Sequence, residues 1–384
     1  MKIKINQAFT EAIALAAKAT PKRPSHPVLG CLKVIAQEMN QVTITGFDLS
    51  IGITRYVQTE VLGGTGGICL PAGLISEIVK EIKDEPEAVL EVNPSTHECV
   101  LVVGPGDTRF KLQGTRTDEY PEFPKSEDSR EIVVSPKGLT KALDAVEYSV
   151  STDQTKGVLM GIHFNLTKAE LAATDGHRLG VCPFEFAGES SELTGFTLPS
   201  AAVAVIKSAL DSDDNDVSIS VDREGSNIKI NVGKTLITSR AVSGNYPSYG
   251  QLIPREFESS ITLNTQEFYT ALKRVAIVSI KGKSAIKLSG SATPLGINQV
   301  DLSSDTADVA GVKTSVLIQE GSIGEDIAFN IKYLIDAVNH IKTPQVTLHM
   351  NTPTSPVIVT PYSGDTEAIP QEKHLVMPIQ IRNL

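Results

Sequence analysis

Two titratable side chains in the phrase ATDGHRL, residues 173–179, have the spacing of an acid–base pair. A carboxylate such as Asp175 can orient a histidine such as His177 so that its imidazole acts as a general base. The phrase therefore makes an enzyme using Asp175 and His177 one alternative. No GxSxG, HExxH or GxxxxGK[ST] motif accompanies it. The four cysteines are far apart without zinc-ligand spacing, so we expect four buried core thiols and no metal or organic cofactor.

The elements that would position this phrase occur three times along the chain. A short strand followed by an amphipathic helical pattern begins at Ile3, Ile132 and Ile261, and a second helix is predicted over 71–84, 199–210 and 330–342. Alternating segments such as QVTITGFDLSIGITRYV predict antiparallel hairpins between the helices. The sequence therefore predicts an α+β fold of three repeated domains, each with two helices packed on antiparallel sheets and about eight strands. The predicted domains are 1–126, 127–254 and 255–384.

One aspartate follows the same predicted strand in every repeat. These residues are Asp48, Asp175 and Asp305, and only Asp175 has a histidine two positions later. Because aspartate at a strand end commonly hydrogen-bonds its own backbone, we interpret all three as turn formers. This interpretation argues against a catalytic pair.

Composition limits the classes of partner and compartment. The 384 residues are 41% hydrophobic and carry a net charge of −10. No apolar run is long enough for a membrane helix, and the N-terminus lacks a secretory apolar region, so we expect a cytoplasmic protein without a membrane partner. An acidic balance argues against nucleic acid as a partner of the whole surface. The six predicted helices nevertheless carry ten Lys and Arg against eight Asp and Glu, a weak asymmetry toward a DNA-facing lining that ordinary solvated helices would also show.

Domain size favours a ring of six domains. Fused units of similar shape tend to repeat one rotation, which closes into a ring or continues as a filament. A domain of one third of 384 residues has an equivalent radius of about 18 Å, so three domains leave a hole of about 6 Å and six leave about 36 Å. Two chains together would therefore admit a DNA duplex, and one chain would not.

The C-terminal segment HLVMPIQI is apolar on both faces. Pro378 excludes it from the centre of a sheet. It is either a closing strand or part of a groove for partner peptides, and Met377 suits a groove that adapts to different partners.

The phrases RPSHPVLGCLKV, TDGHRL, NYPSY, FNIKYLIDAV and VMPIQI occur in an order by which the chain resembles the bacterial DNA polymerase III beta subunit family, the DNA sliding clamps, over its full length. The resemblance implies the DNA clamp fold and a ring-shaped head-to-tail homodimer whose helices line the hole. It also implies a processivity factor without catalytic activity that encircles double-stranded DNA independently of sequence.

The resemblance further implies a pocket for partner peptides between the second and third domains. Its users would be the replicative DNA polymerase alpha subunit, the clamp loader, repair polymerases and mismatch repair proteins. The matching positions are Leu159, Thr174, Gly176, His177, Arg178, Leu179, Pro247, Leu252, Asn330, Tyr333, Pro356, Val357, Val376, Met377, Pro378 and Ile379. Gln251 and Gln380 stand where many relatives carry arginine, and Arg382–Leu384 extends past the usual end, which leaves the peptide preference open.

For DNA, the resemblance points to Arg23 and Lys156, with Lys80 and Lys207 as looser candidates. Each phosphate contact would be weak and exchangeable, as sliding requires. A monomeric peptide-binding adaptor without a DNA role is the remaining alternative.

Overall fold

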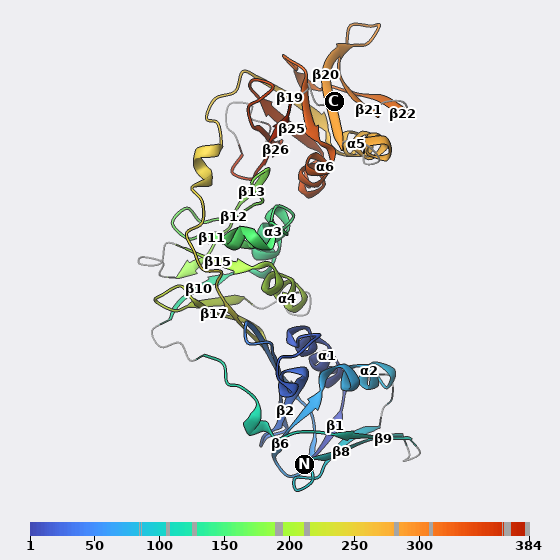
Figure 1. Ribbon diagram of the computed structural model, residues 1–384, viewed down its shortest axis with the longest axis vertical. Coiled ribbons are helices and arrows are strands. Elements are labelled where there is room, and N and C mark those ends of the chain that lie inside the picture. The colour runs from blue at the N-terminus through green and yellow to red at the C-terminus, as the bar shows by residue number, and fades with distance from the viewer. Residues whose placement is uncertain are drawn as a thin grey trace. The chain divides into compact units, whose positions relative to one another are not determined.

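The computed structural model (Figure 1) describes residues 1–83, 85, 87–104, 108–124, 129–188, 195–210, 216–279, 284–306, 310–362, 364 and 370–380. The chain packs into two compact units. The first comprises Met1–Lys137 and Glu185–Ala241, and the second comprises Gly138–Phe184 and Val242–Leu384. This division falls inside the second repeat. The three predicted domains therefore correspond to sequence repeats, and their boundaries do not coincide with those of the two units.

The two predicted helices per repeat are confirmed. Side chains fix where several of them begin: the Asn6 and Asn330 carboxamide oxygens accept hydrogen bonds from the first-turn N–H groups of Phe9 and Lys332. One face of each helix is apolar and buried, which holds the helix on its sheets. The helices are α1 (Gln7–Ala16), α2 (Ala72–Glu81), α3 (Pro136–Glu147), α4 (Ser200–Leu210), α5 (Thr265–Ser279) and α6 (Ile331–His340).

The first unit contains two sheets. The smaller has the order β5 (Val61–Gly63), β1 (Lys2–Ile5), β7 (Ala88–Val92), β8 (Glu98–Val103) and β9 (Thr108–Gln113). The larger has the order β14 (Ala187–Gly188), β10 (Arg130–Val134), β16 (Val217–Val221), β17 (Asn227–Val232), β18 (Thr235–Arg240), β4 (Ile51–Gln58), β3 (Gln41–Phe47), β2 (Cys31–Ala36) and β6 (Gly66–Pro71). Strand β15 (Gly195–Pro199) leads into α4.

The second unit repeats this plan. The strands of one sheet that belong to this unit run in the order β11 (Gly161–Asn165), β12 (Glu170–Thr174), β13 (Arg178–Pro183), β27 (Lys373–Val376), β26 (Val357–Pro361), β25 (Gln345–Met350), β19 (Ser259–Asn264) and β23 (Glu320–Gly321). The other runs β22 (Ala310–Leu317), β21 (Asn298–Thr306), β20 (Ala285–Ala292), β24 (Ile327–Asn330) and β28 (Pro378–Ile379).

The predicted hairpins are antiparallel, as the pairs β3–β4, β12–β13 and β17–β18 show. Among the described residues, the three repeats contain nine, nine and ten strands instead of about eight. The excess consists of strands of two or three residues, β5, β14, β23 and β28, which are too short to show an alternating pattern. Pro378 lies in the edge strand β28, which agrees with its exclusion from a sheet centre.

Consecutive repeats are joined by a strand pair inside one continuous sheet. In the first unit β4 of the first repeat pairs with β18 of the second, with Ile53 opposite Ile237. In the second unit β13 of the second repeat pairs with β27 of the third, with Leu179 opposite Leu375. In the third repeat, β22 corresponds to β4 and β13, and in the first repeat β9 corresponds to β18 and β27. In the described chain neither β22 nor β9 has a partner from another repeat, and each lies at the end of its own sheet.

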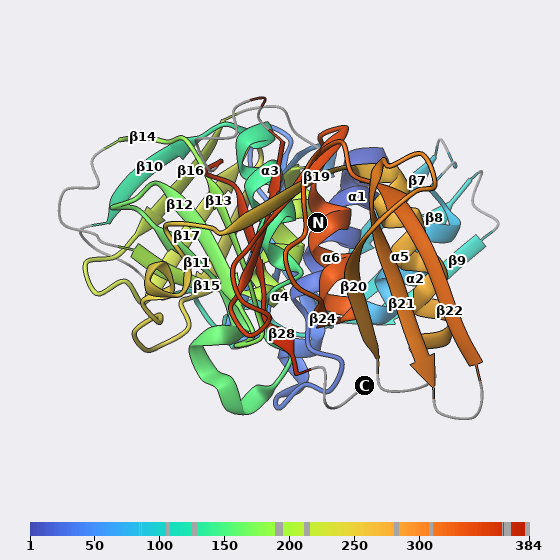
Figure 2. The same ribbon diagram turned by 90° about the horizontal axis from the view of Figure 1, so that it is seen from above.

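The cores lie between the helices and the sheets, and within each unit the helices gather on one side (Figures 1 and 2). The predicted burial of all four cysteines is confirmed, and burial raises the pKa of the Cys69, Cys99 and Cys182 thiols to about 12. Such thiols behave as small apolar residues. None of the helices in the described chain has the length and apolar character to cross a bilayer.

Candidate functional site

The turn between β12 and β13 is organised by the Asp175 carboxylate. Its Oδ1 accepts hydrogen bonds from the backbone N–H groups of His177 at 2.9 Å and Arg178 at 3.1 Å. The Thr174 hydroxyl donates to the Arg178 carbonyl at 2.6 Å and accepts from the Gly176 N–H at 3.1 Å. Gly176 has a φ of 92°, which favours glycine at this position. The turn is therefore rigid.

The turn-forming role predicted for the repeated aspartate is confirmed at two of its three positions. Asp48 Oδ1 accepts from the N–H groups of Ser50 at 2.8 Å and Ile51 at 2.6 Å. Asp305 lies within β21, and its side chain is outside the described residues. The same carboxylate chemistry thus shapes the β3–β4 turn and the β12–β13 turn.

This geometry does not make Asp175 and His177 an acid–base pair. Asp175 Oδ1 binds main-chain N–H groups, and Oδ2 accepts from the Arg178 Nε at 2.9 Å. The exposed His177 ring instead stacks on Tyr333, with centroids 6.0 Å apart and planes 13° apart. A general base needs a partner that orients its ring nitrogen, and the carboxylate is committed elsewhere.

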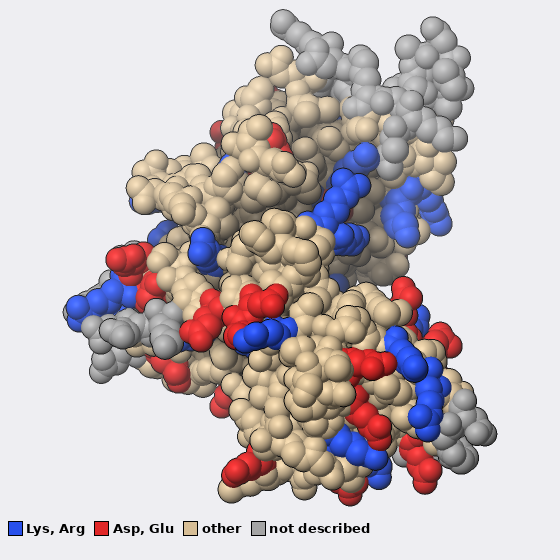
Figure 3. Space-filling model, turned by 60° about the horizontal axis from the view of Figure 1, so that its bottom comes forward, with Lys and Arg blue, Asp and Glu red and all other residues tan. Residues whose placement is uncertain are grey.

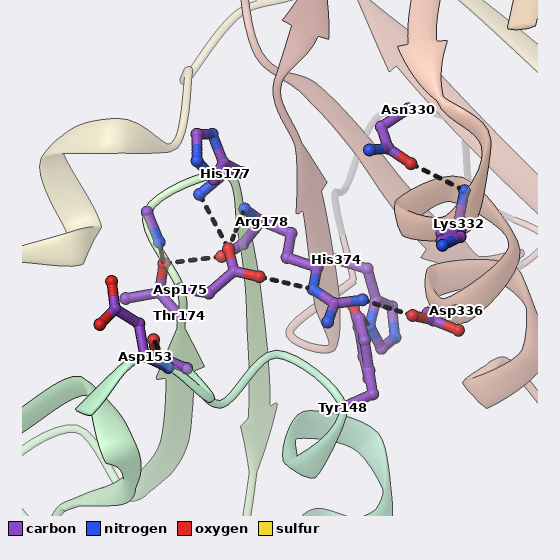
Figure 4. Close-up of polar contacts among 12 residues, drawn as sticks. Tyr148, Asp153, Thr174, Asp175, His177, Arg178, Asn330, Lys332, Asp336 and His374 are labelled. Carbon is purple, nitrogen blue, oxygen red and sulfur yellow. Dashed lines mark hydrogen bonds and ion pairs between the residues drawn. The ribbon is translucent and has the colours of Figure 1, made fainter. Parts of the chain in front are cut away.

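Arg178 connects the second repeat to the third (Figure 4). Besides Asp175, its guanidinium binds Asp336 Oδ2 at 2.5 Å, and Asp336 belongs to α6. The guanidinium carbon also lies 5.3 Å from the ring centroid of Tyr148 and 4.8 Å from that of Tyr333. The side chain is only 13% exposed, so these charge-assisted and cation–π contacts are partly shielded from water.

A buried polar chain lies beneath Arg178. The Tyr148 hydroxyl lies 2.9 Å from Nδ1 of the fully buried His374, and His374 Nε2 lies 3.4 Å from Glu372 Oε1. Tyr148 also stacks on His340 at 4.5 Å. Burial raises the pKa of Tyr148 and lowers that of His340, so both side chains stay neutral near pH 7. Helix α6 is thereby attached to the segment that follows α3.

The apolar tail completes the site by changing sheets. Val376 ends β27 opposite Arg178, and Pro378 starts β28 opposite Phe329. Between them the Met377 N–H donates to the His177 carbonyl at 2.9 Å, and the Met377 side chain is 36% exposed. The tail is therefore a closing strand on both sheets, and Met377 is presented beside the Asp175 turn.

The link after β18 is attached to the two ends of β12 by two tyrosines, Tyr246 at the Asp175 turn and Tyr249 at the other end. The Tyr246 hydroxyl accepts from the Thr174 N–H at 3.0 Å, and its ring stacks on His163 at 4.7 Å. The Tyr249 hydroxyl donates to Glu170 Oε1 at 2.7 Å. The link carries Pro247 and Leu252, both exposed.

The predicted pocket positions divide into a floor and a surface. Thr174, Leu179, Val357 and Val376 are buried and can only support what binds above them. The remaining positions are exposed or half-buried, and all sixteen belong to the second unit. We call the exposed and half-buried set the candidate partner surface: Leu159, Gly176, His177, Arg178, Pro247, Leu252, Asn330, Tyr333, Pro356, Met377, Pro378 and Ile379.

Sequence reasoning did not identify Asp336, Tyr148 or His374 as part of this site. One signal for Asp336 was available, because it follows Tyr333 by three residues in a helix and so shares its face. Tyr148 and His374 are 226 residues apart and carried no comparable signal.

The four DNA candidates differ in their surroundings. Arg23 and Lys80 are exposed, and Lys207 on α4 is half-buried. Lys156 donates to the Asp175 carbonyl at 2.6 Å, so it also fixes the β12–β13 turn. Figure 3 shows basic and acidic side chains interspersed over much of one face, in keeping with the weak charge signal of the sequence. Gln251 and Gln380 are exposed, and Arg382–Leu384 lies outside the described residues.

No group of three or more His, Cys, Asp or Glu side chains suited to a metal ion occurs in the part of the chain that the structure describes.

Acidification should destabilise the second unit through its buried histidines. Burial lowers the pKa of His340 and His349 below the ordinary value of about 6.5. The unfolded chain therefore binds protons more readily, so stability is complete above pH 6.5 and is lost as the pH falls below it. We expect calorimetric melting temperatures to drop between pH 7.5 and 5.5, and to drop less in His340→Gln. The exposed His26→Gln should retain the full drop, and an equal drop in all three chains would contradict this account.

The comparisons with known proteins agree across the whole length. Family models of the DNA polymerase III beta subunit match residues 1–124 as the N-terminal domain, 133–248 as the central domain and 250–380 as the C-terminal domain. A beta sliding clamp of Synechococcus elongatus is 33% identical over 379 residues, covering 97% of both chains. A second, from Synechocystis, is 30% identical over 394 residues and covers 98% of both.

Solved structures agree on the fold. The DNA polymerase sliding clamp of Bacillus subtilis superposes with a TM-score of 0.87 at 24% identity, covering 99% of both chains. The DNA polymerase III subunit beta of Pseudomonas aeruginosa gives 0.87 at 22% identity, covering 99% of this chain and 100% of the other. With its three repeats, its two-helix domains and the rigid turn at residues 174–178, this chain belongs to the DNA polymerase III beta subunit family, the bacterial beta sliding clamps.

Proposed function

We propose that two copies of this chain close head to tail into a ring that encircles duplex DNA, and that the ring tethers replication proteins through the candidate partner surface. The role is that of a processivity factor without catalysis, acting in the cytoplasm. The observation that carries the proposal is that one kind of junction joins the repeats twice within the chain, while the third copy of each half of that junction, β22 and β9, has no such partner among the described residues.

The strand part of the junction is the first support. β4 pairs with β18, and β13 pairs with β27. The third-repeat counterpart of β4 and β13 is β22, and the first-repeat counterpart of β18 and β27 is β9. Each lies at the edge of its sheet in the part of the chain that the structure describes, and an edge strand presents backbone groups that a second strand can pair. Pairing β22 of one copy with β9 of another would repeat the internal junction.

The helix part of the junction is the second support. α1 contacts α4, and Lys18, in the 3-10 turn after α1, donates from Nζ to Ser208 Oγ of α4 at 2.8 Å. Tyr148 after α3 stacks on His340 of α6. By this pattern α5 requires α2 of another copy. The ends carry matching apolar side chains, because Ile277 on α5 is 67% exposed and Leu74 on α2 is 47% exposed.

The two apolar residues occupy positions that are used inside the chain. Ile277 lies thirteen residues after Asn264, as Tyr148 lies thirteen after Ser135. Leu74 is the third residue after the N-cap of α2, as Tyr333 is after the N-cap of α6. Tyr148 and Tyr333 are the two rings on either side of Arg178. Ile277 and Leu74 would face each other across a dimer junction at these positions, where apolar burial stabilises association.

Six domains in one ring leave about 36 Å, enough for a duplex. Arg23, Lys80, Lys156 and Lys207 supply the proposed phosphate contacts. A family member made for sliding needs contacts that break easily, so no deep basic groove is required.

The candidate partner surface has the makeup of an anchor site. It combines apolar groups with the few fixed polar groups of His177, Arg178 and Asn330 over a buried floor. We propose that it binds peptide segments of the replicative polymerase alpha subunit, the clamp loader, repair polymerases and mismatch repair proteins. The polarity of the exposed Gln251 and Gln380 would make its rim less basic than an arginine rim.

Retention on circular DNA tests the proposal. A closed ring is held by topology, so clamps loaded on an intact circle should remain through gel filtration at about 0.5 M salt, where ordinary phosphate contacts are lost. Cutting the circle with a restriction enzyme should release them within minutes. Equal loss from intact and cut circles would contradict encirclement, and a single-chain mass in sedimentation would favour the monomeric adaptor.

A further inference from the structure

A hollow lies in the first unit, and its lining shares no residue with the candidate partner surface. Its volume is about 370 Å³, which is within the range of small-ligand sites. It is bounded by the turn before β2, the β3–β4 turn and the segment after β9. The residues around it are His26, Pro27, Val28, Leu29, Leu49, Thr115, Glu119 and Pro121.

Three of these residues are the repeat counterparts of positions on or beside the candidate partner surface. Leu49 corresponds to Gly176, because each follows the repeated aspartate, and Pro121 corresponds to Pro247 in the repeated Tyr-Pro. Leu29 corresponds to Leu159, because each lies two residues before the start of the equivalent strands β2 and β11. The hollow is therefore the first-junction form of the same site.

The walls of the hollow are firmly held. Tyr120 is buried and its hydroxyl lies 3.4 Å from the Thr45 carbonyl. Phe123 packs edge-on against Phe47 with centroids 4.7 Å apart. The Thr115 backbone forms two hydrogen bonds with Cys69, at 3.0 and 2.9 Å. A site with walls fixed in this way binds without a large ordering cost.

Leu49 has an unusual backbone at the rim of the hollow. Its φ is 76°, a left-handed conformation that is unfavourable for a large side chain, whereas its counterpart at φ 92° is Gly176. The Asp48 carboxylate holds the turn through the Ser50 and Ile51 N–H groups. The strained turn leaves the Leu49 side chain 42% exposed beside the hollow. An exposed apolar side chain on a strained turn is a feature that ligand sites often share.

The charge at the rim is negative. Glu119 is exposed and forms no direct ion pair within the described chain, because Arg116, which lies close enough to interact electrostatically with Glu119, is bound to Asp118. By the repeated Tyr-Pro, the counterpart of Glu119 beside the candidate partner surface is Asn245, which carries no charge. The two sites therefore differ in the charge that they would select.

We propose that this hollow is a second peptide-anchoring site, which takes an aliphatic side chain against Leu49 and a neighbouring lysine or arginine against Glu119. The inference rests on the proposed function only for the class of ligand, a partner peptide. Its preference for a cationic peptide, which the uncharged Asn245 at the counterpart position does not supply, assigns it to partners other than those of the candidate partner surface.

Photo-crosslinking on the full-length protein tests the site directly. The probe is the peptide acetyl-Gly-Lys-Leu-Leu-Lys-Gly-amide with a diazirine on the first leucine, compared with versions that carry Glu for Lys or Ser for Leu. Mass spectrometry should place the adducts of the Lys-Leu peptide within 26–29, 49 and 115–121. The Glu and Ser versions should label there at least fivefold less.

Three variants make the result specific. Glu119→Lys should lower labelling by the Lys-Leu peptide at least fivefold and raise labelling by the Glu version, and Leu49→Asp should abolish both. Glu38→Lys, an exposed carboxylate of the same unit, should change neither. Each variant is used only if its melting temperature matches that of the parent chain.

The outcomes separate this inference from the proposed function. The second site is overturned if labelling by the Lys-Leu peptide is unchanged in Glu119→Lys, or if the adducts lie outside 26–29, 49 and 115–121. Loss of labelling at the hollow in His177→Asp would mean that the two sites are not independent and overturns it as well. If the protein is not retained on circular DNA but the hollow is still labelled, the proposed ring is wrong and the proposed peptide site in the hollow stands.

Discussion

Replacing Ile277 by Asp is expected to convert the dimer to a monomer in sedimentation velocity at micromolar concentration. The α5 side chain is 67% exposed in the single chain and would become buried at the junction against α2. An unpaired carboxylate buried there costs about 2–4 kcal/mol per junction. Because a two-chain ring contains the junction twice, the dissociation constant should rise roughly a thousandfold or more.

A control and a rescue make this result specific. Leu295 is 87% exposed on the β20–β21 hairpin, outside the proposed junction, so Leu295→Asp should leave the dimer intact. A chain carrying both Ile277→Lys and Leu74→Glu places opposite charges across each junction and should recover part of the affinity. If Ile277→Asp and Leu295→Asp chains sediment alike, the proposed junction is wrong.

The parts of the fold that sequence predicted are those set by local patterns. All six helices occur where the apolar spacing placed them, since each must bury one face on a sheet. The Asp48 and Asp175 turns were also predictable, because their hydrogen bonds reach only two or three residues along the chain. The family resemblance could then add positions such as Met377, which no local pattern would connect to His177.

Contacts between segments far apart in the sequence could not be predicted from sequence patterns. The pairing of β13 with β27 joins residues almost two hundred positions apart, and it makes the second repeat contribute to both compact units. Arg178 was expected on the partner surface, but its bond to Asp336 depends on how α6 packs against that strand pair. The positive φ of Leu49 was hidden too, because leucine gives no sign of a left-handed turn.

The second large effect is expected at Arg178. In Arg178→Ala the carboxylates of Asp175 and Asp336 lose their shared cation, and the Tyr148 and Tyr333 rings lose the group between them. Breaking a partly buried pair leaves an uncompensated charge, and since Asp336 is 42% exposed the loss should be about 2–3 kcal/mol. Hydrogen exchange at the β13–β27 backbone amides should report the weakening.

Partner binding should fall along with that stability, because Arg178 holds α6 and Tyr333 against the turn that presents His177. We expect the affinity of the candidate partner surface for a polymerase-derived peptide to drop about tenfold to a hundredfold, by the loss of about 1.4–2.8 kcal/mol. Arg178→Lys should have a stability and a peptide affinity between those of the parent chain and Arg178→Ala, because one ammonium cannot match the geometry of two carboxylates as a guanidinium does. Arg116→Ala removes an exposed arginine paired with Asp118 and should change neither quantity by more than a few tenths of a kcal/mol. Equal effects of Arg116→Ala and Arg178→Ala would show that the bridge between the repeats contributes no more than an ordinary surface ion pair.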